Sequence, residues 1–155
     1  MNAEARLTAL NLSLPPSPRP MATYLPAVRH GDLLYVSGHG PFLPDGSLMT
    51  GKLGAGLDVD AGKAAARQVG LAILATMKAN LGSLDKVVRL IKVLGLVNCT
   101  QNFTDQPKVI NGFSDLMVEV FGDAGKGARS AVGAPSLPEN IAVEVEAIFQ
   151  VRDDA

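Results

Sequence analysis

A strict alternation of side chains near the end of the chain constrains the fold more than any other feature. Every second residue between Ile141 and Val151 is apolar. Successive side chains of a β-strand point to opposite faces, so this segment predicts a strand with one fully buried face. The other face carries Glu144 and Glu146, roughly 7 Å apart along the strand. Two carboxylates on one face require either charge partners or a chemical role.

Two other segments have the periodicity of amphipathic helices. From Asp60 to Asn80 one face is apolar, and Gly82 follows as a stop signal. The second helix is predicted to begin near Thr104, Asp105 and Pro107 and to end at Gly122. The apolar face of the first is Ala65, Val69, Ala72, Ile73, Thr76 and Met77, and that of the second is Val109, Phe113, Leu116, Met117 and Val120.

The remaining regular segments predict strands. Ala27 to Arg29 and Leu33 to Val36 flank the turn His30-Gly31-Asp32, which indicates a β-hairpin. A second hairpin is predicted at the end of the chain, between Ala128 to Ala134 and Ile141 to Val151. The order hairpin, helix, strand, helix, hairpin predicts an α+β domain in which two helices pack on one face of a mixed β-sheet.

The strand between the two predicted helices, Val87 to Asn98, is apolar on both sides. One side is expected to hold Val87, Ile91, Val93 and Val97, and the other Val88, Leu90, Leu94 and Leu96. Since the helices cover only one face of the sheet, the second side would leave an apolar surface in a lone copy. We therefore expect the chain to associate with copies of itself.

The chain of 155 residues fits one ordinary domain. Residues 1–20 are expected to form an N-terminal arm that starts with a short amphipathic helix within Met1 to Asn11 and is proline-rich at its end; residues 21–155 form the domain. Glu4 and several polar residues interrupt the first apolar stretch, so no secretory signal is expected. No apolar run reaches the roughly 18 residues that span a bilayer, and we expect a soluble, cytoplasmic protein without a membrane partner.

Charge and composition restrict the partners. Fourteen basic and fifteen acidic residues give a formal charge of −1, and there is no tryptophan, so neither a basic surface nor stacking side chains favour nucleic acid. The single Cys99 excludes an internal disulfide and a thiolate zinc cluster. We expect no metal and no cofactor, and a small molecule or protein as partner.

Several motifs resemble those of the reactive-intermediate deaminases, the YjgF-like proteins once labelled perchloric-acid-soluble endoribonucleases. The longest is Ala128-Arg129-Ser130-Ala131-Val132, then Leu137-Pro138, then Val143-Glu144-Val145-Glu146-Ala147. Further matches are Tyr24 in the first strand, Ser37-Gly38 and Asn111-Gly112, and the similarity runs from about Leu14 to Val151. The resemblance implies a chorismate-mutase-like fold, a homotrimer with its sheets facing inward, and ligand clefts between subunits.

The resemblance also implies an activity, the hydrolysis of short-lived 2-imino acids or enamines to 2-keto acids and ammonia. Arg129 would hold the substrate carboxylate through two parallel hydrogen bonds, a geometry that lysine does not reproduce. Glu144 would pass protons to and from the reacting atoms, and pairing across the closing hairpin would bring it near Arg129. The substrate-binding residues would be Tyr24, Ser37, Gly38, Asn111 and Ala131.

The chain departs from the well-studied branch of that family in ways that leave alternatives open. Ala131 replaces a cysteine, His39 replaces a glutamine, and the loop from Phe42 to Val59 is typical of a longer branch. His39, in a glycine-rich loop, is either an exposed residue that selects substrate or acts as a base, or, as we favour, a structural histidine. Arg129 and Glu144 could form an interface salt bridge only. The alternatives to an enzyme of this kind are a trimer that binds small carboxylates without turnover and, least favoured, an endoribonuclease.

Overall fold

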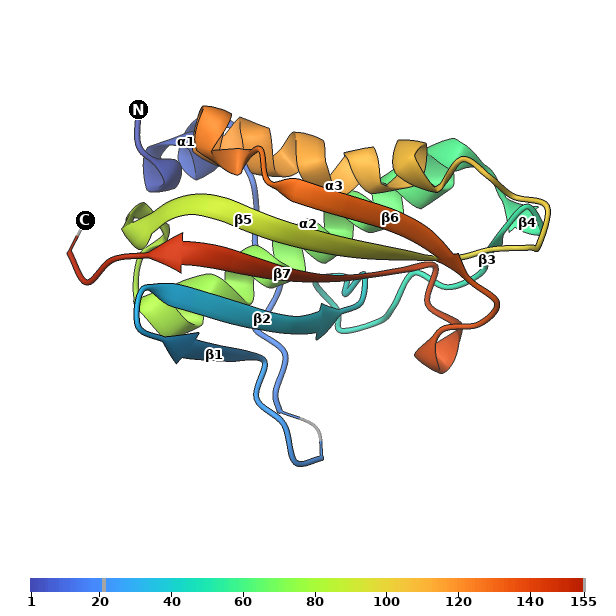
Figure 1. The fold of residues 1–155 in the computed structure, drawn as a ribbon, viewed down its shortest axis with the longest axis horizontal. Coiled ribbons are helices and arrows are strands. Elements are labelled where there is room, and N and C mark those ends of the chain that lie inside the picture. Colours follow the sequence, from blue (N-terminus) through green and yellow to red (C-terminus); the bar gives the residue numbers. More distant parts are fainter. Residues whose placement is uncertain (21, 155) are drawn as a thin grey trace.

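The computed structural model describes residues 1–20 and 22–154, and its centre is a five-stranded mixed sheet (Figure 1). The strands are β1 (Ala27–His30), β2 (Leu33–His39), β5 (Val87–Asn98), β6 (Ala128–Ala134) and β7 (Val143–Val151). They lie in the order β1-β2-β7-β5-β6. All neighbouring pairs are antiparallel except β5 and β6, which run parallel. The predicted mixed sheet and its first hairpin are confirmed.

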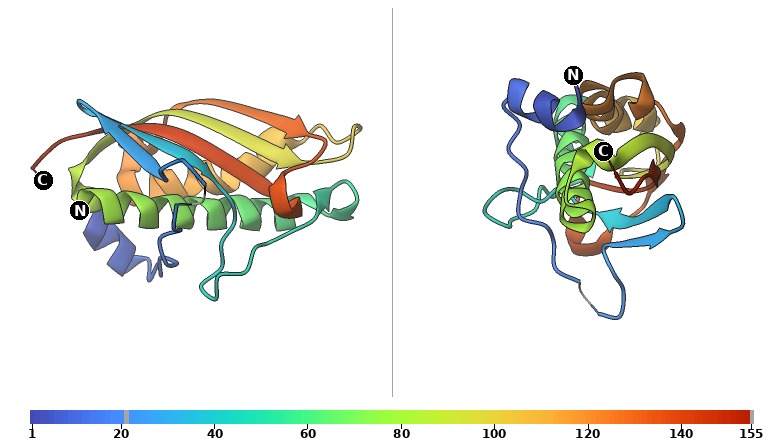
Figure 2. Two further views of the ribbon diagram at one scale, coloured as in Figure 1. Left: turned by 90° about the horizontal axis from the view of Figure 1, so that it is seen from below. Right: turned by 90° about the vertical axis from the view of Figure 1, so that its left-hand side faces the viewer.

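Two long helices cover one face of the sheet, α2 (Val59–Leu81) and α3 (Gln106–Phe121) (Figure 2, left). The side chain of Asp58 accepts a hydrogen bond from the Ala61 amide and so caps α2, which ends at Gly82 in the left-handed conformation. Gly122 follows α3, as predicted. The helices approach closely at Gly112, where a β-carbon would overlap the carbonyl oxygen of Lys63.

The core lies between these helices and β7. The predicted apolar face of β7 is buried along its whole length, and the helix faces expected from periodicity meet it. Phe149 of β7 is fully buried, and its ring centroid lies 6.3 Å from that of Phe121 at the end of α3. The alternation that predicted this strand is thereby confirmed.

A third helix, α1 (Ala3–Ala9), confirms the helix predicted within the first eleven residues. It contacts α3 and the short 3-10 helix η1 (Leu84–Lys86), and it buries Ala3 and Leu7. Two hydrogen bonds join α1 to η1 reciprocally: the Glu4 amide donates to Asp85 Oδ1 (3.0 Å), and the Leu84 amide donates to Glu4 Oε1 (2.9 Å). Further short elements are β3 (Lys52–Leu53), β4 (Gly56–Leu57), η2 (Gly122–Gly125) and η3 (Pro138–Asn140).

The predicted closing hairpin is wrong. β6 and β7 follow each other in the chain, but β5 lies between them and pairs with both. A strand can form hydrogen bonds along both of its edges, and β5, which is apolar on both faces, can be buried in the interior of the sheet. Its insertion therefore satisfies the backbone groups of β5 on both edges, through β6 on one side and β7 on the other. The connecting residues, including η3, cross the end of β5, where the Asn98 amide donates to the Ala142 carbonyl (2.9 Å).

Two smaller expectations are also corrected. Simple alternation predicted Ile91 on the same side as Val93 and Leu90 on the opposite side. Irregularities in the pairing of β5 with β7 reverse this: Leu90 faces the helices and is 1% exposed, whereas Ile91 is 37% exposed. Tyr24 precedes the first strand, because β1 begins at Ala27.

The sheet face opposite the helices is open and partly apolar. Exposed on it are Val28, Tyr35 and Val132, with half-buried Leu94, Leu96 and Ile148 among them. The surplus of apolar side chains expected on this face is therefore present. No helix in the described ranges is long and apolar enough to span a bilayer.

Candidate active site

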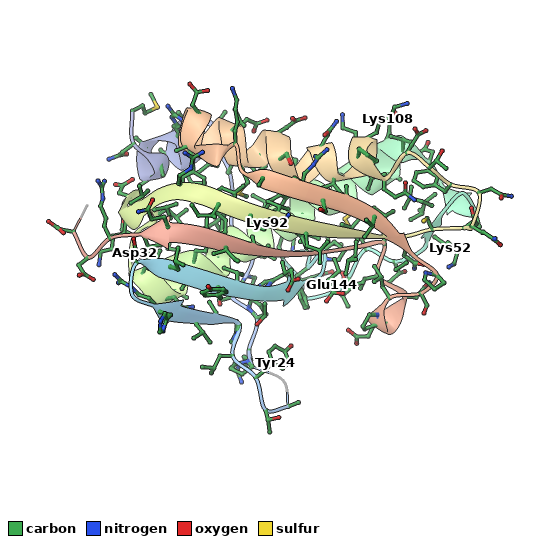
Figure 3. All side chains as sticks on the ribbon, viewed as in Figure 1. Tyr24, Asp32, Lys52, Lys92, Lys108 and Glu144 are labelled. Atoms are coloured by element: carbon green, nitrogen blue, oxygen red, sulfur yellow. The ribbon has the colours of Figure 1, made fainter. Side chains whose placement is uncertain are left out.

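A cavity of about 450 Å³ lies where the proline-rich arm, the end of β2 and the start of β7 meet. Its lining includes Tyr24, Ser37, Gly38 and Glu144, four of the residues expected at a substrate site, together with apolar side chains such as Phe42 and Ile141. In Figure 3, Glu144 lies between β2 and β7, and Tyr24 lies on the segment that leads into β1. A volume of this size and a mostly apolar lining with a few polar groups are typical of small-molecule sites.

Two acidic residues line this cavity, Glu139 in the connection before β7 and Glu144 on β7 itself. Glu144 stands on the open face of the sheet, in register with Leu96 of β5, and is half-buried. Its carboxylate forms no hydrogen bond or ion pair with another described residue. Burial raises the pKa of the Glu144 carboxyl group, and the negative charge of Glu146 raises this pKa further. Glu144 can therefore take up and release a proton closer to neutral pH than an ordinary glutamate.

Gly38 makes the space that the Glu144 carboxyl group occupies. A β-carbon at residue 38 would lie 2.5 Å from Glu144 Oε1. Gly38 belongs to a β-bulge: Val36 pairs with Ala147 and His39 pairs with Val145, so β2 has one more residue than β7 in this interval. The bulge brings the backbone of β2 against the carboxyl group.

Ser37, the other residue of the bulge, is fixed by the segment that precedes β1. Its hydroxyl donates to the Leu25 carbonyl (2.6 Å), and its amide donates to the Pro26 carbonyl (2.9 Å). Because the only hydroxyl proton is used in this way, the lone pairs of Ser37 Oγ remain as acceptors. Ser37 can therefore accept a hydrogen bond from a ligand, and it ties the Tyr24 segment to β2.

The alternative in which His39 is exposed in a loop is wrong. The alternative that we favoured, a structural histidine, agrees with the fold. His39 ends β2 and is 3% exposed, with Nδ1 2.6 Å from the Ser37 carbonyl oxygen and Nε2 2.7 Å from Thr76 Oγ1 on α2. Burial lowers the pKa of His39, so the ring is neutral near pH 7. The extra residue of the bulge reverses the side-chain parity after Val36 and turns His39 toward the helices.

Arg129 lies elsewhere, on the edge strand β6. It pairs with Val93 and faces α3, where its Nη1 donates to Asn111 Oδ1 (2.9 Å) and Ser114 Oγ (3.1 Å). Ser114 was not expected at the site, although its spacing of three residues from Asn111 places both on one helical face. Ala131 lies two residues further along β6 and is half-buried.

The expected site residues thus form two separate groups in one chain. Tyr24, Ser37, Gly38 and Glu144 line the cavity, whereas Arg129 stands with Asn111 and Ala131 at the far edge of the sheet. Arg129 and Glu144 lie on opposite faces, and β5 separates their strands. Their expected proximity through a closing hairpin is therefore wrong within one chain, because no such hairpin forms.

The positions of the His, Cys, Asp and Glu side chains determine whether a metal ion could be held. In residues 1–20 and 22–154, no group of three or more His, Cys, Asp or Glu side chains converges to hold a metal ion. Cys99 is buried, with its sulfur 3.7 Å from Gln106 Nε2. Both ring nitrogens of His39 already have partners in the protein.

Comparison with known proteins agrees with this architecture. Residues 4–150 match the family described as "YjgF/chorismate mutase-like, putative endoribonuclease". Protein TCP17 of Trypanosoma cruzi is 43% identical over 150 residues, which are 96% of this chain and 94% of that protein. A 2-iminobutanoate/2-iminopropanoate deaminase of Dermatophagoides farinae is 29% identical over 142 residues, 91% of this chain and 95% of the relative.

A solved structure has the same fold over nearly the whole chain. The crystal structure of the protein Atu1372, "with unknown function", from Agrobacterium tumefaciens is 41% identical and superposes with a TM-score of 0.88, covering 97% of this chain and 94% of that one. The family match extends over the sheet and all three helices described above. The chain therefore belongs to the YjgF/chorismate mutase-like family.

Proposed function

We propose that the chain is an enzyme that hydrolyses reactive 2-imino acids, or their enamine tautomers, to 2-keto acids and ammonia in clefts between the copies of a homotrimer. The observation that carries this proposal is the Glu144 carboxyl group, which faces the cavity without a protein partner and has a raised pKa. A carboxyl group in this condition is suited to general acid–base work.

The reaction needs three proton transfers, all to or from oxygen and nitrogen atoms bonded to one carbon atom. Water adds to the C=N carbon of the protonated imine, and the Glu144 carboxylate accepts the proton that this water loses. The resulting carbinolamine then breaks its C–N bond: the Glu144 carboxyl group returns the proton to the departing nitrogen and ammonia leaves. The Glu144 carboxylate then accepts the proton of the hydroxyl group, whose oxygen becomes the keto oxygen, and releases this proton to solvent. One group performs these transfers most efficiently when its pKa is near the working pH.

Other atoms of the cavity would orient the substrate. Ser37 Oγ, whose proton is engaged with the Leu25 carbonyl, offers an acceptor for the N–H of the imine or of the carbinolamine. Gly38 leaves the space beside the Glu144 carboxyl group in which water and the imine carbon can meet it. Tyr24 and the apolar lining would surround the substrate side chain and limit access of bulk water.

The substrate carboxylate requires a cation. Arg19 of the proline-rich arm lines the cavity, but the residue that the family resemblance implies is Arg129, which in the same chain faces away from the cavity. We assign this role to Arg129 of a neighbouring copy. β6 is an edge strand, which another copy can approach, and the open sheet face carries apolar groups that association would cover. An interface that joins the β6 edge of one copy to the Glu144 cavity of the next is heterologous, and such an interface forms a ring when the rotation between copies closes. A ring of three is what the family resemblance implies.

Asn111 and Ser114 suit this arrangement, since they bind one nitrogen of the guanidinium and hold its plane in place. The mite relative's name, 2-iminobutanoate/2-iminopropanoate deaminase, supports the same substrate class.

The test is a direct assay of deamination. Freshly generated 2-iminobutanoate or 2-iminopropanoate is added to the protein, and the release of ammonia and keto acid is followed against buffer. Glu144→Gln, which preserves shape but replaces the titratable carboxyl group with an amide, should lower kcat by roughly a hundredfold to ten-thousandfold. Glu146→Gln is the matched control two residues along the same face and should retain most of the activity.

A wild-type rate equal to buffer with several imino acids would refute the proposal. In that case a rise in melting temperature with 2-ketobutanoate, without any turnover of imino acids, would instead identify a binding protein, because a ligand selective for the native state stabilises it.

A further inference from the structure

The bulge that forms one wall of the cavity is tied to the molecule by an unbroken series of hydrogen bonds. All three backbone and side-chain polar groups of Ser37 have partners: its amide and hydroxyl donate to the Pro26 and Leu25 carbonyls, and its carbonyl is 2.6 Å from His39 Nδ1. His39 continues the series to α2 through Thr76 Oγ1 at 2.7 Å. Helix α2 is thereby connected through β2 to the segment that carries Tyr24.

The chemistry of these partners fixes the direction of each bond. A carbonyl oxygen only accepts, so Nδ1 of His39 carries the proton and donates to Ser37. In a neutral ring Nε2 is then an acceptor, and the Thr76 hydroxyl donates to it. One tautomer of His39 and one rotamer of Thr76 satisfy the whole series.

We propose that His39 and Thr76 are positioning residues of the Glu144 cavity: together they anchor the bulge of β2 to α2 and thereby fix Ser37 and Gly38 relative to the Glu144 carboxyl group. This role rests on the proposed function for its kinetic consequence. His39 is among the residues that line the cavity, but both of its ring nitrogens are bonded to protein atoms, and Thr76 is fully buried behind it. The Gly38 backbone approaches Glu144 so closely that a small movement of the bulge changes where the carboxyl group stands.

The burial of His39 and Thr76 indicates a role beyond packing of the core. Thr76 is fully buried in a helix face that is otherwise apolar, and His39 is 3% exposed. Apolar side chains would fill this space without the desolvation of two polar groups. A bulge, in contrast, leaves residues outside the regular ladder, and their position depends on bonds such as these.

The kinetic test uses near-isosteric changes at Thr76. Thr76→Val removes the hydroxyl and should lower kcat for 2-iminobutanoate by roughly tenfold to a hundredfold, with KM close to that of the wild type. Thr76→Ser retains the hydroxyl and should restore most of kcat. Ile73→Val, a similar buried change one turn away on α2, is the control for general loosening and should lower stability without changing kcat.

His39 provides an independent pair of variants should Thr76→Val fail to fold. The amide of His39→Gln can donate to the Ser37 carbonyl and accept from Thr76, so this variant should keep kcat within the range of Thr76→Ser. His39→Leu fills the same apolar surroundings without any bond and should behave like Thr76→Val. If Thr76→Val and His39→Leu both fold and keep the wild-type kcat, the positioning role is refuted.

A measurement that does not use activity separates this inference from the proposed function. Amide hydrogen exchange at Ser37, whose amide is bonded to Pro26, should become at least roughly tenfold faster in Thr76→Val but not in Thr76→Ser or Ile73→Val. This result would support the anchor even if the wild-type protein proved inactive toward imines. Exchange at Ser37 that is equal in all four proteins would overturn it.

Discussion

The Glu144 carboxyl group lies so close to the backbone of Gly38 that a side chain at position 38 would overlap it. A β-carbon there would lie 2.5 Å from Glu144 Oε1, well inside van der Waals contact. Gly38 does not have a positive φ, so the backbone itself would accept another residue. The requirement for glycine comes from the carboxyl group, and the two residues should behave as a coupled pair.

Gly38→Ala should therefore reduce activity more than stability. The added methyl group pushes against the flexible end of the Glu144 side chain, which can rotate away at little cost, but a displaced carboxyl group no longer meets the reacting atoms. We expect kcat to fall by roughly tenfold to a hundredfold, with a melting temperature near that of the wild type. Steady-state kinetics and thermal unfolding of the two proteins measure both quantities.

A double-mutant cycle checks the stated cause. Glu144→Asp withdraws the carboxyl group by one methylene, so Gly38→Ala should cost less activity when combined with Glu144→Asp than it does in the wild type. Equal effects of Gly38→Ala in both backgrounds would mean that the loss arises from something other than contact with residue 144.

The raised pKa of Glu144 predicts how its contribution to stability depends on pH. Because the folded-state pKa lies above the ordinary value of 4.5, the native protein binds more protons than the unfolded chain between the two values. The contribution of Glu144 is therefore fully present below pH 4.5 and is lost as pH rises through the folded-state pKa. Relative to Glu144→Gln, the wild type should lose free energy of unfolding across this interval, as urea titrations at several pH values would record.

Glu146→Gln separates the two causes of that shift. Burial is the larger cause and the charge of Glu146 the smaller, so removal of this charge should lower the pKa of Glu144 without returning it to its ordinary value. A carboxyl titration of Glu144 by NMR in the variant tests this directly, and an unchanged pKa would exclude a contribution from Glu146.

The proposed division of the site between two copies makes a prediction about mixtures. Arg129→Ala and Glu144→Gln should each be inactive alone, because every cleft lacks one group. When the two chains are co-expressed and assemble at random, about a quarter of the clefts in a ring combine an intact Glu144 with an intact Arg129 from the neighbour. The mixture should then recover a corresponding share of wild-type kcat.

The control for this experiment is a mixture of Glu144→Gln with the double variant, in which every cleft lacks at least the Glu144 carboxylate, and which should stay inactive. No recovery in the first mixture would show that Arg129 and Glu144 do not serve a common cleft.

Sequence patterns predicted the helices and β7 well because a buried face leaves a periodic record along a continuous segment. The same parity argument placed Glu144 on the face opposite the helices. Strand order leaves no such record: the short connection between β6 and β7 suggested a hairpin, yet β5 separates them. The single extra residue at Ser37–Gly38 was equally hidden, and it reverses the side on which His39 lies.

The contact between α2 and α3 predicts the sign of one stability change. From helix propensity alone, Gly112→Ala in the middle of α3 should stabilise the protein by roughly 0.5–1 kcal/mol. The added β-carbon would instead overlap the carbonyl oxygen of Lys63, and backbone atoms cannot turn aside as a side chain can. We expect the free energy of unfolding to fall by roughly 1–3 kcal/mol, measured by urea denaturation. A stabilised variant would mean that the helices separate readily at this point.

The central place of β7 has a consequence for how the protein matures during synthesis. β2 and β5 are made early but have no direct contact in the sheet, because the gap between them is filled by a strand that leaves the ribosome after both. Until then, the nascent chain can hold the β1–β2 hairpin, the parallel β5–β6 pair and the helices, while the edges of β2 and β5 that will face β7 stay unpaired. Glu144 belongs to this last strand, so its carboxyl group lines the cavity only after β7 has paired with β2 and β5.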